Sequence, residues 1–292
     1  MFVKMAHHST APFTLLFIFF LMTSGAKMYA NAKNITVVNL CKETVWPGII
    51  THGNSYQGDG FTLKPGQSAF YDTPSGWSGR IWARTGCNFN NSTSTCQTGS
   101  CGPSINCTGP GSLPATIAEF TLGGDTDFYD VSLVDGFNVP VMVKPYGGKG
   151  NCSTAGCDGD LRQSCPSELT VKANGKVIGC RSACDAFNSD QFCCRGSFGD
   201  QATCLPSNYS TSFKQVCPAA SSYAFDDRTS IITCSAEEYI VAFCASRNQT
   251  VCSYHDNKLF CDQSKGLKSF SQSWWRFLML VLPLTLNIGV IF

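Results

Sequence analysis

The chain has 292 residues, of which 18 are cysteines and 27 are glycines, and only 14% of its residues are charged. The 21 basic and 20 acidic residues nearly balance, but several basic residues lie in the terminal segments, so the rest of the chain is acidic. This charge pattern excludes a nucleic-acid-binding protein, which needs a basic surface. The composition favours a loop-rich, β-rich extracellular protein over a helical one.

The segment 1–32 has the character of a secretory signal peptide. It has a basic start, and its apolar run 13–22 is too short to span a bilayer as a helix. Ala30-Asn31-Ala32 is an Ala-x-Ala cleavage site, so we expect the mature chain to begin at Lys33. Cleavage after Ala26 is the alternative.

The cysteines are expected to form disulfides. No Cys-x-x-Cys spacing occurs, and two of the four histidines lie in the signal segment, so a metal site is not indicated. An even number of cysteines leaves no spare thiol for catalysis. We therefore expect a disulfide framework with neither metal nor cofactor.

Short alternating or β-branched segments predict strands at 35–40, 80–84, 118–122, 128–134, 138–143, 230–234 and 239–244. Within 80–84, the period of two places Arg80 and Trp82 on the face opposite to Ile81. Turns rich in Gly, Pro, Ser and Asn separate these strands. The pattern predicts a mainly β fold, a sandwich or a flattened barrel.

The segment 147–217 is different, because nine cysteines crowd into it. Apolar residues at helical spacing predict two short helices there, one over 180–187 and one over 209–217. Neither helix is long enough to be stable alone. We interpret this segment as an insertion held by cross-links.

Seven Asn-x-Ser/Thr triplets mark candidate glycosylation sites, and therefore surface positions. Two adjacent asparagines in this set are not both expected to carry a glycan. The candidates are Asn34, Asn90, Asn91, Asn106, Asn151, Asn208 and Asn248.

The C-terminal segment 265–292 is mostly apolar. A polar stretch with small residues, which starts at Ser264, leads into an apolar run from Trp274 to Phe292. This is the pattern of a glycosylphosphatidylinositol (GPI) anchor signal, with Ser264 as the candidate attachment residue. A retained transmembrane helix is the alternative, since the apolar run is just long enough to span. However, Arg276 interrupts the run and no basic cluster follows it.

Several motifs accompany the first sixteen cysteines. They include Thr-Val-Trp-Pro-Gly at 44–48, Arg-Ile-Trp-Ala-Arg-Thr-Gly-Cys at 80–87, Pro-Ala-Thr-Ile-Ala-Glu-Phe at 114–120, Phe-Tyr-Asp-Val-Ser-Leu-Val-Asp-Gly-Phe-Asn-Val-Pro at 128–140 and Ala-Phe-Asp-Asp at 224–227. With the order and spacing of the cysteines, these motifs resemble the thaumatin-like family, plant pathogenesis-related family 5. The match covers 33–245, followed by a linker at 246–264. Ser100 departs from the family, which usually has Asp there.

The resemblance implies a thaumatin-like flattened β-sandwich with a disulfide-rich helical lobe and a small loop lobe. A cleft is expected between the sandwich and the helical lobe. The family order implies the pairs Cys41–Cys244, Cys87–Cys96, Cys101–Cys107, Cys152–Cys234, Cys157–Cys217, Cys165–Cys180, Cys184–Cys193 and Cys194–Cys204. Cys252 and Cys261 lie outside the family core and are expected to pair with each other.

In the family, that cleft carries five charged residues. Matched motif by motif, the resemblance implies that their counterparts here are Arg80, Glu119, Asp130, Asp135 and Asp226. Clustered carboxylates raise one another's pKa, as a glycosidase requires. Glu119 is therefore a candidate acid, and Asp135 a candidate nucleophile or base. The alternative is structural: Asp135 forms a turn, Asp226 caps a loop and Arg80 makes an ion pair.

The resemblance also implies plant defence: an antifungal protein that binds β-1,3-glucan of fungal cell walls in its acidic cleft. A weak endo-β-1,3-glucanase and a protein-binding inhibitor or receptor-like module are the alternatives. We expect a monomeric glycoprotein at the outer face of the plasma membrane, held by a GPI anchor, or in the cell wall. Aromatic side chains such as Phe137 are candidates for stacking on sugars, although core packing is the commoner fate of such a residue.

Overall fold

The computed structural model describes residues 32–53, 58–89, 95–226, 230–255 and 258–261. The chain divides into two compact units, Met1–Arg247 and Asn248–Phe292. Residues 1–31 of the predicted signal peptide, Ser264 and the tail 265–292 lie outside the described residues, as do Asn90 and Asn91. Among the helices that are described, none is both long and apolar enough to cross a membrane.

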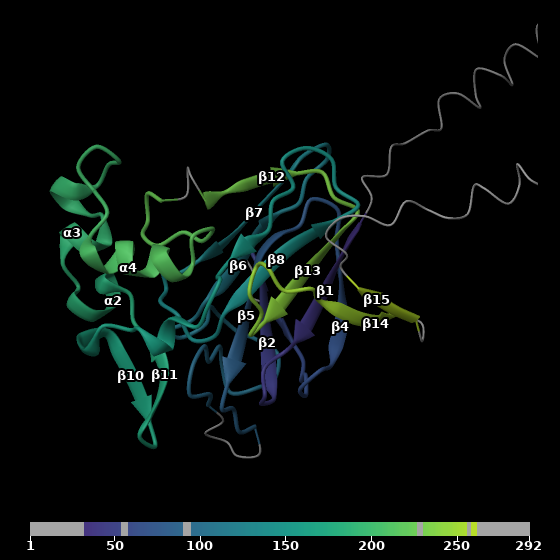
Figure 1. Cartoon of the computed structure of the whole chain (residues 1–292), viewed down its shortest axis with the longest axis horizontal. Helices are drawn as coiled ribbons and strands as arrows, with labels where there is room; N and C mark the ends of the chain where they lie inside the picture. The colour runs from purple at the N-terminus through teal and green to yellow at the C-terminus, as the bar shows by residue number, and fades with distance from the viewer. Residues whose placement is uncertain (1–31, 54–57, 90–94, 227–229, 256–257, 262–292) are drawn as a thin grey trace, which may run out of the picture. The chain divides into compact units, whose positions relative to one another are not determined.

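The first unit is built on two β-sheets, which lie one over the other in Figure 1. The five-stranded sheet has the order β4-β1-β13-β8-β9. Its strands are β1 (Lys33–Asn39), β4 (Ser68–Thr73), β8 (Val141–Tyr146), β9 (Ala155–Gly156) and β13 (Glu238–Phe243).

The six-stranded sheet has the order β12-β7-β6-β5-β2-β3. Its strands are β2 (Val45–Thr51), β3 (Gly58–Gly60), β5 (Ser78–Thr85), β6 (Ile117–Thr121), β7 (Asp127–Ser132) and β12 (Ile232–Cys234). The sandwich fold expected from the sequence is confirmed.

Apolar side chains from both sheets form one core between them. Tyr239 of β13 packs against Phe120 of β6 and Tyr129 of β7, with ring centroids 5.5 and 5.2 Å apart. Ile81 lies in this core, whereas Trp82 joins a second apolar cluster on the opposite face of the sheet. The alternation predicted for 80–84 is therefore present.

One central strand, β2, was not predicted from the sequence. Pro47 and Gly48 lie in its middle, and both residues normally weaken a strand. Packing explains the glycine, because a Cβ atom at position 48 would lie 2.7 Å from the ring of Trp82. The aromatic ring thus needs a strand residue without a side chain.

The helical lobe follows β9 in the chain and lies to one side of the sandwich in Figure 1. It contains the hairpin β10 (Thr170–Ala173) and β11 (Lys176–Cys180), the helices α2 (Ala183–Phe187), α3 (Asp190–Cys193) and α4 (Asn208–Val216), and the 3₁₀ turns η1 (Leu161–Gln163), η2 (Ser167–Leu169) and η3 (Gly196–Phe198). Four disulfides join parts of this lobe: Cys157–Cys217, Cys165–Cys180, Cys184–Cys193 and Cys194–Cys204.

The first predicted helix is shorter than the predicted range 180–187. Cys180 ends β11, where it pairs with Thr170. The helix begins at Ala183 because the Ser182 hydroxyl caps it, accepting a hydrogen bond from the backbone N–H of Asp185. The second predicted helix is present as α4, and the Ser207 side chain caps it in the same way.

The remaining disulfides tie the sandwich and its loops together. They are Cys41–Cys244, Cys87–Cys96, Cys101–Cys107 and Cys152–Cys234. These eight pairs coincide with the pairing that the family order implies.

The second unit contains a hairpin of β14 (Cys252–His255) and β15 (Lys258–Cys261). Cys252 and Cys261 face each other across this hairpin and form a disulfide, as expected.

The described glycosylation candidates all have exposed side chains, as a surface acceptor requires. They are Asn34, Asn106, Asn151, Asn208 and Asn248.

Candidate functional site

Three neighbouring strands bring the first predicted site residues together. The antiparallel register places Arg80 of β5 opposite Glu119 of β6, and Glu119 opposite Asp130 of β7. Because side chains alternate along a strand, all three lie on one face of the sheet, away from the core that holds Ala118 and Val131. We call these residues, together with Asp135 and Asp226, the charged cluster.

Arg80 makes ion pairs with two carboxylates of this cluster. Its Nε lies 2.6 Å from Glu119 Oε1, and its Nη1 lies 3.9 Å from Asp135 Oδ2. The three side chains are 25–36% exposed. This trio is therefore accessible to a ligand, and at full ionisation it has one negative charge in excess.

Asp135 lies in the turn that follows β7. The turn closes through a hydrogen bond from the backbone N–H of Gly136 to the carbonyl of Leu133, and Gly136 has a φ of 87°, which suits glycine. Burial raises the pKa of Asp135 above its ordinary value; the charge of Arg80 opposes this shift, and the charge of Asp185 adds to it.

Asp185 is a site residue that the sequence reasoning missed. It lies on α2, and its carboxylate accepts a hydrogen bond of 2.7 Å from Arg181 Nε. The sequence offered a weak signal, because Arg181 and Asp185 are four residues apart, the spacing of an ion pair on a helix. Nothing in that spacing indicated that α2 would place Asp185 near Asp135.

The other two acids of the charged cluster are buried and hydrogen-bonded within the protein. Asp130 is 7% exposed and accepts a hydrogen bond of 3.1 Å from the Ser221 hydroxyl. Asp226 is 9% exposed and accepts hydrogen bonds of 2.9 Å from Lys214 Nζ and from both the backbone N–H and the hydroxyl of Ser222. Both acids therefore have structural partners.

Lys214 was also missed by the sequence reasoning. Its ammonium group donates to Asp226, to the carbonyl of Ala220 at 2.9 Å and to the Ser230 hydroxyl at 2.8 Å. This ammonium ties α4 to Ala220, Asp226 and Ser230. The available signal was that Lys214 is the one charged residue of α4.

The charges around Asp226 determine its protonation. Burial alone would raise the pKa of Asp226, but the hydrogen bonds from Lys214 and Ser222 outweigh burial and lower it. Asp226 is therefore held as a carboxylate, and the structural interpretation given to it from the sequence agrees with these contacts.

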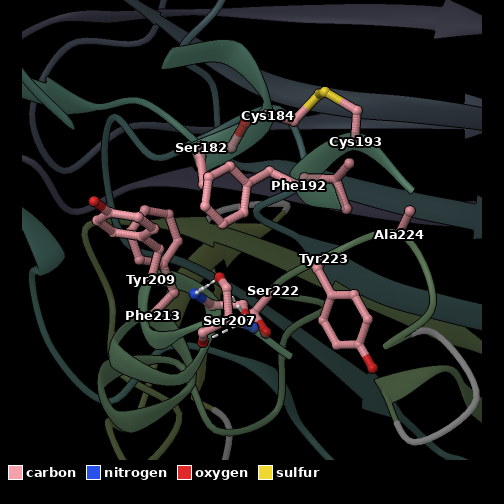
Figure 2. A pocket seen from close by; sticks show the side chains of 13 residues that line it. Ser182, Cys184, Phe192, Cys193, Ser207, Tyr209, Phe213, Ser222, Tyr223 and Ala224 are labelled. Carbon is pink, nitrogen blue, oxygen red and sulfur yellow. Dashed lines mark hydrogen bonds between the residues drawn. A yellow bond between two sulfur atoms is a disulfide. The ribbon is translucent and has the colours of Figure 1, made fainter. Parts of the chain in front are cut away.

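A small pocket of about 50 Å³ lies between the helical lobe and the segment 222–224. Figure 2 shows the rings of Phe192, Tyr209 and Tyr223 around it. Val134, which precedes Asp135, also lines the pocket. This volume holds a few water molecules and is too small for a sugar ring.

Phe137 does not face a ligand. Its side chain is fully buried in the core, and its backbone pairs with Cys180. The suggestion that Phe137 stacks on a sugar is therefore wrong, and the commoner role in the core applies.

Within the described ranges, no group of three or more His, Cys, Asp or Glu side chains is placed to hold a metal ion.

Comparison with known proteins identifies the family. The model of the Thaumatin family matches residues 39–245, so the chain belongs to this family. A pathogenesis-related thaumatin-like protein 3.5 of Cryptomeria japonica is 53% identical, over 74% of this chain and 92% of its own length. Pathogenesis-related protein 5 of Arabidopsis thaliana is 49% identical, over 79% of this chain and 96% of its own length.

Solved structures give more distant similarities. The thaumatin-like xylanase inhibitor TLXI aligns with a TM-score of 0.43 and 25% identity, over 72% of this chain and 99% of its own. A family 64 laminaripentaose-producing β-1,3-glucanase from Paenibacillus barengoltzii aligns with a TM-score of 0.48 and 14% identity, over 73% of this chain and 74% of its own.

Thaumatin-like pathogenesis-related proteins are typically secreted, which agrees with the disulfides of this chain.

Replacing Lys214 with Met is expected to lower the free energy of unfolding by about 2–3 kcal/mol at pH 7, because the buried Asp226 loses its cation. In the parent, the lowered pKa of Asp226 contributes stability above the ordinary pKa of a carboxyl group, and this contribution is lost as the pH falls. In the variant, the two contributions of Lys214 that lower this pKa are lost, so the pKa of Asp226 is higher than in the parent. The two proteins should therefore differ less at pH 3 than at pH 7, as measured by chemical denaturation.

Lys172→Met is the matched control, because Lys172 is exposed on β10. It should leave stability nearly unchanged at both pH values. An equal loss of stability for Lys214→Met at both values would show that the ion pair with Asp226 is not the cause.

Proposed function

We propose that this protein is a secreted or cell-surface plant defence protein, antifungal in action, that binds β-1,3-glucan of cell walls at the charged cluster. The observation that carries the proposal is the partly exposed, ion-paired trio of Arg80, Glu119 and Asp135. Membership of the thaumatin family supports the defence role. A monomer with this one cluster suffices for the proposed binding.

The chemistry of the trio suits sugar hydroxyls. A guanidinium group donates hydrogen bonds and carboxylates accept them, while each sugar hydroxyl does both. The ion pairs with Arg80 hold the two carboxylates in place before a ligand arrives, which lowers the cost of ordering them on binding. Asp130 and Asp226 are buried and hydrogen-bonded to Ser221 and Lys214, so we do not assign them a direct contact with the sugar.

A second candidate function is a weak endo-β-1,3-glucanase. Two carboxyl groups in unlike environments are what glycoside hydrolysis requires. Asp135 has a raised pKa, whereas Glu119 is paired closely with Arg80. These environments favour Asp135 as the general acid and Glu119 as the nucleophile or base, the reverse of the roles suggested by the sequence alone.

The location of the protein forms part of the proposal. We infer that the mature chain begins near Lys33, carries N-linked glycans on some of its exposed asparagines, and is held at the outer face of the plasma membrane by a GPI anchor at Ser264. Release into the cell wall is the alternative. The anchor pattern of 265–292 supports the first location.

Binding is tested with laminarin, a soluble β-1,3-glucan, and the disulfide-bonded mature protein. Asp135→Asn and Glu119→Gln should each weaken binding by roughly tenfold, because a neutral amide oxygen accepts a weaker hydrogen bond from the sugar than a carboxylate does and no longer pairs with Arg80. Isothermal titration calorimetry measures the change.

Asp125→Asn removes the same charge at an exposed position outside the charged cluster and should leave the affinity unchanged. If the parent does not bind laminarin, the glucan proposal fails, and a protein-binding inhibitor or receptor-like module becomes the better explanation. If all three variants bind as the parent does, the sugar lies elsewhere.

Hydrolysis is tested by the release of reducing ends from laminarin across pH. If Asp135 is the general acid, activity should fall as the pH rises through its raised pKa. Asp185→Asn removes a charge that raises this pKa, so the fall should move to lower pH. A profile that does not move in this variant would contradict the assignment of Asp135.

The anchor is tested on the full chain expressed in plant cells. Phosphatidylinositol-specific phospholipase should release the protein from membranes, and Ser264→Leu should abolish attachment at this residue because the site requires a small side chain. Retention after phospholipase treatment would favour a transmembrane helix instead.

A further inference from the structure

The face of the six-stranded sheet that carries the charged cluster also carries a second row of side chains. This row lies two residues along the same strands from Arg80, Glu119 and Asp130, a step of about 7 Å. We call it the hydroxyl row; it consists of His52, Ser78, Thr121, Phe128 and Thr233.

The register of the sheet makes the hydroxyl row continuous. Ser78 pairs with Thr121, Thr121 with Phe128, and Phe128 with Thr233. His52, which follows β2, donates its backbone N–H to the Ser78 carbonyl at 2.8 Å. Since neighbouring strands are about 4.8 Å apart, the row runs for about 19 Å across the sheet.

Hydrogen bonds link the polar half of this row. His52 Nδ1 lies 3.2 Å from Ser78 Oγ, which lies 3.1 Å from Thr121 Oγ1. Each hydroxyl has one proton, so a chain of such bonds runs in a single direction and leaves a donor at one end and an acceptor at the other. Sugar hydroxyls, which both donate and accept, match this arrangement.

The other half of the row presents an aromatic ring. Phe128 is 45% exposed, although Asp127 and Tyr129 on either side of it are buried. Ile231, which precedes the neighbouring strand β12, is a further exposed apolar residue, at 44%. An exposed ring beside hydroxyl groups suits a pyranose, whose C–H face packs on the ring while its rim makes hydrogen bonds.

The hydroxyl row differs in charge from the cluster beside it. It contains no carboxylate, lysine or arginine, and burial together with the charge of Arg80 lowers the pKa of its one imidazole, His52. The row is therefore uncharged at neutral pH. This favours a neutral polysaccharide over an acidic one or a charged peptide.

We propose that the hydroxyl row is a second subsite for a neutral β-glucan chain, which continues onto it from the charged cluster. The inference rests on the proposed function, and its supporting observation is that both rows lie on one face of the same strands. The charged cluster holds one part of the chain, and Phe128 holds a sugar farther along it.

The test compares short and long ligands by isothermal titration calorimetry, with laminaribiose and laminarihexaose as probes. The parent should bind the hexaose more tightly than the biose. Phe128→Ala should weaken hexaose binding by about tenfold and leave biose binding unchanged. Thr121→Val, which keeps the shape of the side chain, should weaken hexaose binding by about threefold.

Tyr146→Ala is the matched control, because Tyr146 is an aromatic residue 52% exposed on β8 of the other sheet. It should change neither affinity. If Phe128→Ala and Thr121→Val bind the hexaose like the parent while Glu119→Gln weakens both ligands, the second subsite is refuted and the proposed function stands. If the parent binds neither ligand, both proposals fail.

Discussion

The geometry of the site depends on the backbone register of three antiparallel strands. Pairing of β5 with β6 and of β6 with β7 sets Arg80, Glu119 and Asp130 side by side on one face. A slip of one residue would turn these charges into the core and expose Ile81 and Ala118. Burial of that apolar face therefore fixes the register, and the register alone places Arg80, Glu119 and Asp130, whereas Asp135 depends on the turn after β7.

A different kind of constraint places the helical lobe. The nine residues of α4 would not form a stable helix alone, yet the Cys157–Cys217 disulfide fixes the end of this helix to the core. A bridge across 60 residues removes roughly 4 kcal/mol of chain entropy from the unfolded state. This disulfide and the buried side chain of Phe213 hold α4 where Lys214 reaches Asp226, so the cross-link supports the charged cluster through Lys214.

Much of this arrangement follows from sequence pattern, and some of it does not. Alternation located β5 and its two faces, because side-chain direction is a local property of a strand. The membership of the charged cluster came from the family resemblance, because no local pattern brings Asp226 near Asp130. Lys214 and Asp185 were missed for the same reason: their importance comes from where cross-linked helices are placed, which is a property of the whole fold.

The charged residues of this family therefore do not form a uniform set in this chain. Burying a carboxylate is costly unless donors compensate it, and Asp130 and Asp226 have such donors within the segment 214–222. Their hydrogen-bonding capacity is thus largely used by the protein itself. The carboxylates of Glu119 and Asp135 both pair with Arg80 and are 25% and 36% exposed, so we expect recognition by charge to depend mainly on these three residues.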